Sequence, residues 1–160
     1  MKKLLFLFAS IALLSCSKEN DDDNSNSTPA SGNIVSKWHL IDILENGKSV
    51  SGYSCNKEFD ITEFTSSGQS IIKYSDKDSK NVCTQYTENG TYTILDNILT
   101  EIQKNGSVKT YEARYKIKEL TTTSLKLEQT YLFEADDNGK NPYTTNYAEG
   151  ESVNIYTKLN

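Results

Sequence analysis

The sequence contains few of the residues and none of the patterns that common enzymes need. Its 160 residues include one histidine, His39, and no serine-hydrolase G-x-S-x-G, zinc-protease H-E-x-x-H or glycine-rich phosphate loop. His39 stands between Trp38 and Leu40 in an expected strand, where a residue at the rim is favoured over a general base. We therefore expect a protein that is not an enzyme and that has no metal site and no cofactor.

Positive charge is also scarce. The net charge is −5, and acidic side chains still outnumber basic ones from residue 33 onward. Domains that bind nucleic acid instead carry a basic patch or stripe that neutralises phosphates. The composition therefore argues against a nucleic-acid partner.

The sequence has no apolar run of the roughly 20 residues that a membrane-spanning helix needs. Its longest run covers residues 4–14, is interrupted only by Ser10, and follows the basic pair Lys2-Lys3. A short apolar segment behind a positive start is typical of a signal peptide.

The apolar run ends at Leu13-Leu14-Ser15-Cys16, which resembles the lipobox of bacterial lipoproteins. The resemblance implies that residues 1–15 are removed and that Cys16 becomes a lipidated first residue. Several acyl chains would then anchor the protein stably to a membrane. The alternative is an ordinary secretory peptide cut nearby, which would leave Cys16 as a thiol.

Residues 16–33 predict a flexible tether. Asn20 to Asn33 contains no apolar residue except Ala30, so it cannot bury enough surface to order itself. Residues 17–23, with the sequence SKENDDD, resemble the surface-export signals of Bacteroidetes lipoproteins. That resemblance implies attachment to the outer membrane at the cell surface, whereas a simple solvated acidic tether is the alternative.

With Cys16 assigned to the lipid, Cys55 and Cys83 are left, and a disulfide between them is the favoured interpretation. Such bonds are permitted outside the cytoplasm. A closed loop of about 29 residues would stabilise the fold by about 3–4 kcal/mol. Two free thiols or a metal pair are the alternatives.

Turn residues recur at short intervals, and several are the Asn-Gly pairs that supply the positive φ of tight hairpin turns. The expected turns are Asn46-Gly47, Ser67-Gly68, Asn89-Gly90, Asp96-Asn97, Asn105-Gly106 and Asn138-Gly139. Short runs with alternating polarity lie between them and predict strands. The expected strands cover 35–44, 58–64, 70–75, 82–86, 91–95, 98–103, 111–118, 125–133 and 153–158. Phe59 and Ile61 are expected to share a face, and 136–151 is expected to be a long loop.

The clearest alternation lies in 111–118 and 125–133, where one face is apolar and the other charged, as in antiparallel sheets. The expected buried face contains Tyr115, Leu127 and Tyr131, with Gln129 as its polar exception. Many short strands joined by tight turns favour closure, because closure removes exposed edges. We therefore predict an all-β, antiparallel up-and-down barrel of about eight strands over residues 34–160.

The strand and turn pattern resembles the lipocalin-like domain of Bacteroidetes lipoproteins. The segments that carry this resemblance are Ser36-Lys37-Trp38-His39-Leu40, Asn46-Gly47-Lys48, Gly90-Thr91-Tyr92-Thr93-Ile94, Tyr115-Lys116-Ile117-Lys118 and Tyr156-Thr157-Lys158. It implies that Trp38 plugs the closed end of the barrel, although an ordinary core position is the alternative.

A barrel of this kind implies a small apolar or amphipathic ligand. The candidate ligand-binding residues are Tyr92, Tyr115, Leu127, Gln129 and Tyr131. The alternative is a non-catalytic lipoprotein that interacts with a protein partner, in which the loop 136–151 would take part.

Overall fold

A computed structural model describes residues 33–50, 55 and 59–160. The predicted signal peptide, Cys16 and the predicted tether up to residue 32 lie outside this part of the chain. The strands are β1 (Ser36–Glu45), β2 (Lys48–Ser49), β3 (Ile61–Phe64), β4 (Gln69–Lys77), β5 (Cys83–Leu95), β6 (Ile98–Asn105), β7 (Val108–Leu120), β8 (Ser124–Glu134), β9 (Tyr143–Asn146) and β10 (Ser152–Lys158). The described residues include no helix long and apolar enough to cross a membrane.

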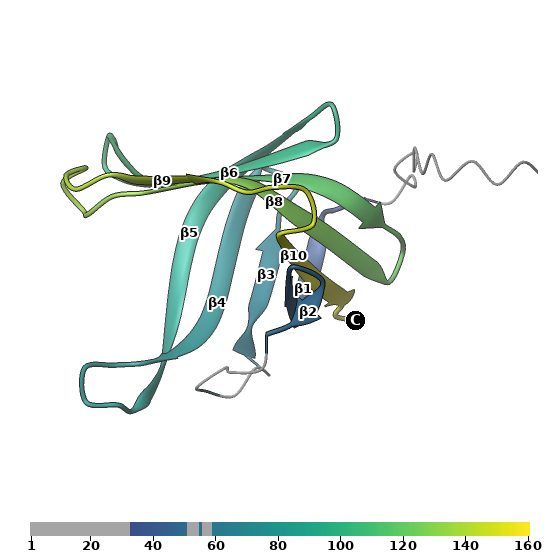
Figure 1. Cartoon of the computed structure of the whole chain (residues 1–160), viewed down its shortest axis with the longest axis horizontal. Coiled ribbons are helices and arrows are strands. Elements are labelled where there is room, and N and C mark those ends of the chain that lie inside the picture. The colour runs from purple at the N-terminus through teal and green to yellow at the C-terminus, as the bar shows by residue number, and fades with distance from the viewer. Residues whose placement is uncertain (1–32, 51–54, 56–58) are drawn as a thin grey trace, which may run out of the picture.

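Eight of the described strands close into an antiparallel barrel (Figure 1). Neighbouring strands pair in the order β1-β3-β4-β5-β6-β7-β8, and β10 closes the ring by pairing with both β8 and β1. The short strands β2 and β9 lie outside the ring, on β1 and β8 respectively. The predicted all-β up-and-down barrel is therefore confirmed.

The tight turns follow from residues that tolerate positive φ. Asn46 and Gly47 have φ of 51° and 74° between β1 and β2, and Asp96 and Asn97 have 49° and 66° between β5 and β6. Positive φ at both central residues is what a type I′ hairpin turn needs. Sequence alone was sufficient to place these turns.

The prediction of a turn at Asn89-Gly90 is wrong, because both residues lie inside β5. Gly90 pairs with Ser70 of β4. A Cβ atom on Gly90 would lie 2.8 Å from both the Ile102 carbonyl oxygen and Ser70 Oγ. The glycine therefore permits a close approach between strands instead of a reversal of the chain.

The buried face at β3 is not the one that Phe59 and Ile61 were expected to share. Thr62 and Phe64 are buried, as is Asp60 just before the strand, whereas Phe59 is exposed. Thr62 pairs with Trp38 of β1, which directs both side chains into the barrel. Apolar alternation failed here because two of the inward positions are polar.

β8 contains an irregularity that the alternating pattern did not predict. Arg114 of β7 pairs with Tyr131, whereas the next residue of β7 pairs with Gln129, so Thr130 is an extra residue. An extra residue moves the side chains beyond it to the opposite faces. Leu132 therefore packs against the core, and the prediction that Tyr131 belongs to the buried face is wrong.

The core surrounds the fully buried Trp38, whose indole Nε1 donates a hydrogen bond to the Ile34 carbonyl at 2.7 Å. This bond satisfies the only polar atom of a side chain that has no access to water. Leu99, Leu125 and other apolar side chains complete the same cluster. The role of Trp38 as a plug stays a prediction.

Two further features lie near the ends of the strands. Cys55 and Cys83 form the predicted disulfide, with their Cα atoms 5.7 Å apart, so the segment between β2 and β3 is joined to the start of β5. β4 and β5 form a long hairpin whose tip extends beyond the neighbouring strands (Figure 1). The expected loop 136–151 is not all loop, because β9 lies within it and pairs with β8.

Candidate functional site: a cavity inside the barrel

The barrel contains a cavity of about 420 Å³ between β1, β3, β4, β6, β7, β8 and β10. This volume lies within the range of small-molecule sites, roughly 300–1,000 Å³. Its apolar lining consists of Leu40, Phe64, Ile72 and Leu127, with the rings of Tyr74, Tyr115 and Tyr156. An apolar wall of this extent can bury a hydrocarbon or aromatic group.

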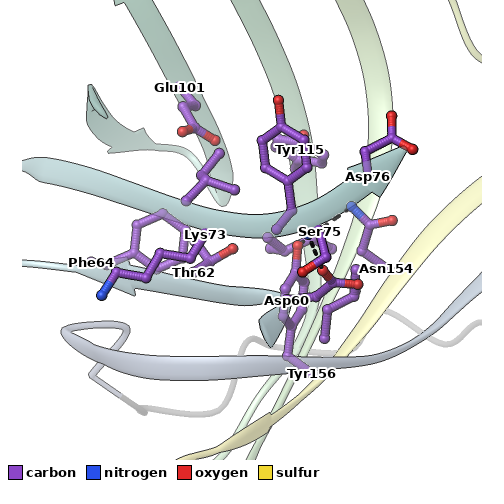
Figure 2. A pocket seen from close by; sticks show the side chains of 14 residues that line it. Asp60, Thr62, Phe64, Lys73, Ser75, Asp76, Glu101, Tyr115, Asn154 and Tyr156 are labelled. Carbon is purple, nitrogen blue, oxygen red and sulfur yellow. Dashed lines mark hydrogen bonds between the residues drawn. The ribbon is translucent and has the colours of Figure 1, made fainter. Parts of the chain in front are cut away.

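Polar side chains share the same cavity (Figure 2). They are Asp60, Thr62, Lys73, Ser75, Asp76, Glu101 and Asn154. Acidic groups outnumber the single cation, Lys73. The arrangement suits an amphipathic molecule better than a purely apolar one, since a polar group buried without a partner is unfavourable.

Glu101 is the most deeply buried acid of the cavity, with 3% of the residue exposed. It lies on β6 opposite Ala113 of β7, and its Oε1 accepts a hydrogen bond from Ser70 Oγ at 2.7 Å. Burial raises the pKa of Glu101 to about 7, helped by the negative charge of Glu88 and opposed by the bond from Ser70. The carboxyl can therefore exchange a proton close to neutral pH.

Tyrosine hydroxyls lie beside Glu101. The hydroxyls of Tyr111 and Tyr115 are 3.2 Å apart and form a hydrogen bond. Burial raises the pKa of both tyrosines above the ordinary value, and the nearby Glu101 and Tyr156 raise it further. Both hydroxyls therefore stay protonated and act as neutral hydrogen-bonding groups.

A second polar network connects β4, β5 and β6. Tyr74 donates a hydrogen bond to Glu88 Oε1 at 2.7 Å, and Gln103 Nε2 donates to Glu88 Oε2 at 2.9 Å. Partial burial and the neighbouring Glu88 raise the pKa of Tyr74 to about 12. Both oxygens of Glu88 are thus satisfied by the protein itself.

Asp60 lies at the start of β3, with 8% of the residue exposed. Its Oδ1 accepts a hydrogen bond from the backbone N–H of Ser75 at 3.3 Å, as Figure 2 shows. Its carbonyl oxygen accepts a second bond from the backbone N–H of Leu40. Asp60 therefore connects β1, β3 and β4 at the wall of the cavity.

The structure divides the candidate ligand-binding residues into two groups. Tyr115 and Leu127 line the cavity, whereas Tyr92, Gln129 and Tyr131 do not. The Tyr92 hydroxyl donates to the Thr65 carbonyl at 2.8 Å, and its ring packs edge-on against a neighbouring aromatic ring.

The last two candidates lie elsewhere. Gln129 borders a separate hollow beside Tyr147, and the ring of Tyr131 lies 4.7 Å from the Arg114 guanidinium. Neither side chain therefore lines the main cavity.

Sequence reasoning missed the polar lining of the cavity, above all Asp60, Thr62 and Glu101. These polar side chains occupy inward positions, where an alternating pattern is expected to place apolar residues. One signal could have located Glu101, because it follows the buried Leu99 by two residues and so shares its face. Among the described residues, no group of three His, Cys, Asp or Glu could hold a metal ion.

Comparison with known proteins finds a family match. The sequence profile of the lipocalin-like domain family matches residues 34–127. A crystal structure of an uncharacterized protein from Bacteroides eggerthii is similar over 79% of this chain and 100% of its own, with 14% identity and a TM-score of 0.49. No curated protein matches the chain.

Proposed function

The chain belongs to the lipocalin-like domain family, and from this premise we propose that its barrel binds a small amphipathic ligand. The observation that carries the proposal is the cavity of about 420 Å³, whose wall combines Leu40, Phe64 and Leu127 with buried polar groups. An apolar pocket with a few convergent polar groups is the usual form of a small-molecule site.

We further propose that the protein is a lipoprotein held by Cys16 at the outer membrane, on the cell surface. The lipobox-like LLSC and the acidic SKENDDD segment support this proposal. Acylation at Cys16 would place the barrel at the end of the predicted tether, where it could take up a ligand near the membrane.

Interaction with a protein partner is the second candidate function. Leu95, at the β5–β6 hairpin, is 73% exposed, and Tyr143 of β9 is 58% exposed. Among the described strands, β9 pairs with β8 alone, so one edge of β9 is open to a partner. The cavity brings apolar and buried polar groups together in one place, and ligand binding is therefore the primary proposal.

The test uses the uncharged fluorophore N-phenyl-1-naphthylamine, which becomes brighter in an apolar site. The protein is residues 16–160 with Cys16→Ser, made in an oxidising compartment; we call it the soluble variant. The soluble variant is compared with two proteins that each carry one further substitution, Ile72→Trp or Ile71→Trp. Ile72 lines the cavity, whereas Ile71 borders a separate outer hollow, so the two variants form a matched pair.

The proposal predicts saturable binding to the soluble variant and to Ile71→Trp. It also predicts that Ile72→Trp weakens binding by about tenfold or more, since the added ring occupies the cavity. Equal binding by both tryptophan variants, or no binding by any, would contradict ligand binding in the cavity. Mass spectrometry of molecules released by denaturing the purified protein would then identify the class of any natural ligand.

A further inference from the structure

We infer that Glu101 is the site for the polar head group of the ligand, and that this head group is a protonated amine. The inference rests on the proposed ligand-binding function and makes it chemically specific. It assigns the cavity a cationic amphiphile, in which an ammonium group is joined to an aliphatic or aromatic body.

The first support is the hydrogen bonding of the Glu101 carboxyl. Oε1 accepts a bond from Ser70 Oγ at 2.7 Å, but no described residue donates to Oε2. Glu101 is 3% exposed and belongs to the cavity lining. A buried carboxyl oxygen without a donor is unfavourable. A ligand that donates a hydrogen bond at this point would satisfy it.

The second support is the charge around Glu101. Glu88 of β5 is close enough to raise its pKa, and Asp60 and Asp76 line the same cavity. The neighbouring hydroxyls are those of Ser70 on β4 and of Tyr111 and Tyr115 on β7. Lys73 is exposed, and in Figure 2 its ammonium group points away from the Glu101 carboxyl. This environment favours a cation over an anion.

The third support is the position of the apolar surface. Leu40, Ile72 and Leu127 line the same cavity as Glu101, so one molecule can contact both. The free energy of placing a hydrocarbon body there offsets the loss of hydration at the ammonium group. A small, fully hydrated cation would lack this contribution and is not the expected ligand.

The test measures displacement of N-phenyl-1-naphthylamine from the soluble variant by three probes with the same alkyl chain. They are decylamine, which is protonated at neutral pH, decan-1-ol and decanoate. Each probe is titrated into the soluble variant and into Glu101→Gln. Glutamine keeps an oxygen that can accept the bond from Ser70 but removes the carboxylate.

Glu112→Gln is the matched control. Glu112 is also buried, but it is the neighbour in sequence of Ala113, which pairs with Glu101. Its side chain therefore faces the other side of the sheet, where Lys109 and Arg114 donate hydrogen bonds to it. Glu112 does not line the cavity. The control thus removes a buried carboxylate without touching the proposed site.

The inference predicts that decylamine displaces the fluorophore at a concentration at least about tenfold lower than decanoate. Glu101→Gln should reduce the affinity for decylamine by about tenfold or more, whereas its affinity for decan-1-ol should stay within about twofold. Glu112→Gln should behave like the soluble variant.

A second readout is the release of a proton. At pH 6 the Glu101 carboxyl is largely protonated, so binding of an ammonium ion should release about one proton. At pH 8.5 the carboxyl is already ionised, and binding should release almost none. Calorimetry in buffers with different ionisation enthalpies measures this number. Release at pH 6 that persists in Glu101→Gln would overturn the assignment of Glu101.

The outcomes separate this inference from the function on which it rests. If all three probes bind equally well, or if decanoate binds best, the head-group assignment is wrong while the cavity still binds ligands. If neither the fluorophore nor any probe binds, the proposed function itself fails.

Discussion

Glu101 and Glu112 are both buried, yet their surroundings move their pKa values in opposite directions. The Glu112 carboxylate is 2.6 Å from Lys109 Nζ and 2.6 Å from Arg114 Nη2, and these hydrogen bonds lower its pKa despite burial. Glu101 has only Ser70 as a hydrogen-bond partner among the described residues, and desolvation raises its pKa to about 7. A buried acid without a neighbouring cation lowers the stability of the fold. Groups with pKa values shifted in this way are common at functional sites.

The raised pKa of Glu101 makes the free energy of unfolding depend on pH, and replacement of Glu101 tests this dependence. Below the ordinary pKa of 4.5 the carboxyl is protonated in both the folded and unfolded protein, so it adds no penalty. Between pH 4.5 and about 7 the unfolded chain loses its proton first, and the free energy of unfolding falls as the pH rises. Above pH 7 the loss of stability is constant. It amounts to about 3 kcal/mol, because each unit of difference between the two pKa values corresponds to about 1.4 kcal/mol.

Urea unfolding at pH 5 and pH 8 measures the effect as a difference between the soluble variant and Glu101→Gln. The Glu101→Gln protein is expected to be more stable by about 2–3 kcal/mol at pH 8 and by much less at pH 5. Glu112→Gln should instead lower stability at pH 8, because Lys109 and Arg114 lose their partner. A Glu101→Gln protein that is less stable at pH 8 would show that the carboxylate has a stabilising partner.

The strands and turns show which features the sequence specified and which it did not. The turns at Asn46-Gly47 and Asp96-Asn97 could be predicted from the sequence, because each depends only on positive φ at two adjacent residues. Non-local features were not: the inward face of β3 depends on its pairing with β1, and the shift in β8 depends on its register with β7. Polar residues that line a cavity produce the same sequence pattern as the solvent-facing side of a strand. The pattern therefore did not predict that Asp60 and Thr62 face inward.

Gly90 offers a test at the level of β5. Gly90→Ala would place Cβ 2.8 Å from the Ile102 carbonyl oxygen, a backbone atom that cannot move without disturbing the pairing of β5 with β6. We expect the free energy of unfolding to fall by about 1–3 kcal/mol. Urea unfolding of the soluble variant provides the measurement.

Gly47→Ala serves as the control for Gly90→Ala. Gly47 has φ of +74°, and beyond its chain neighbours no heavy atom lies within 4 Å of the position that a Cβ atom would take. Its substitution therefore reports backbone strain without a clash, and that strain is expected to be about 1 kcal/mol. If Gly90→Ala were no more destabilising than a few tenths of a kcal/mol, the close approach of the strands would not be a constraint on the fold.

The disulfide offers a second test at this level. Cys55 and Cys83 are 28 residues apart in sequence, and joining them limits the unfolded chain. Replacing both with alanine should lower the free energy of unfolding by about 3–4 kcal/mol on the chain-entropy account. A reducing agent should destabilise the protein with intact cysteines and leave the alanine double variant unchanged. Equal stability of the two proteins under oxidising conditions would contradict the prediction.

The molecule as a whole combines a closed barrel with a predicted lipid anchor. Strand count, alternation and turn spacing were sufficient to predict the barrel, because closure removes edges that would otherwise aggregate. The presence of a cavity was not predictable, since the same alternation describes a barrel filled by side chains. Which inward residues leave space, and which polar atoms remain without a partner, depends on three-dimensional packing.

The anchor predicts where the protein fractionates in a bacterial cell that processes lipoproteins. Wild-type protein should be labelled by radioactive palmitate and remain in the membrane fraction, since several acyl chains give stable attachment. Cys16→Ser should lose the label and move to the soluble fraction. A Cys16→Ser protein that stays labelled would contradict lipidation at this residue. Digestion of intact cells by an added protease would report surface exposure separately.

Ligand binding inside the barrel is tested most sharply by locating a bound amphiphile. The measurement is a set of nuclear Overhauser contacts between N-phenyl-1-naphthylamine and the methyl groups of the soluble variant. We expect contacts from Ile72 and Leu127, which line the cavity, and none from Ile71 or the exposed Leu95. Contacts confined to Leu95 or Ile71 would place the ligand outside the barrel and contradict binding in the cavity.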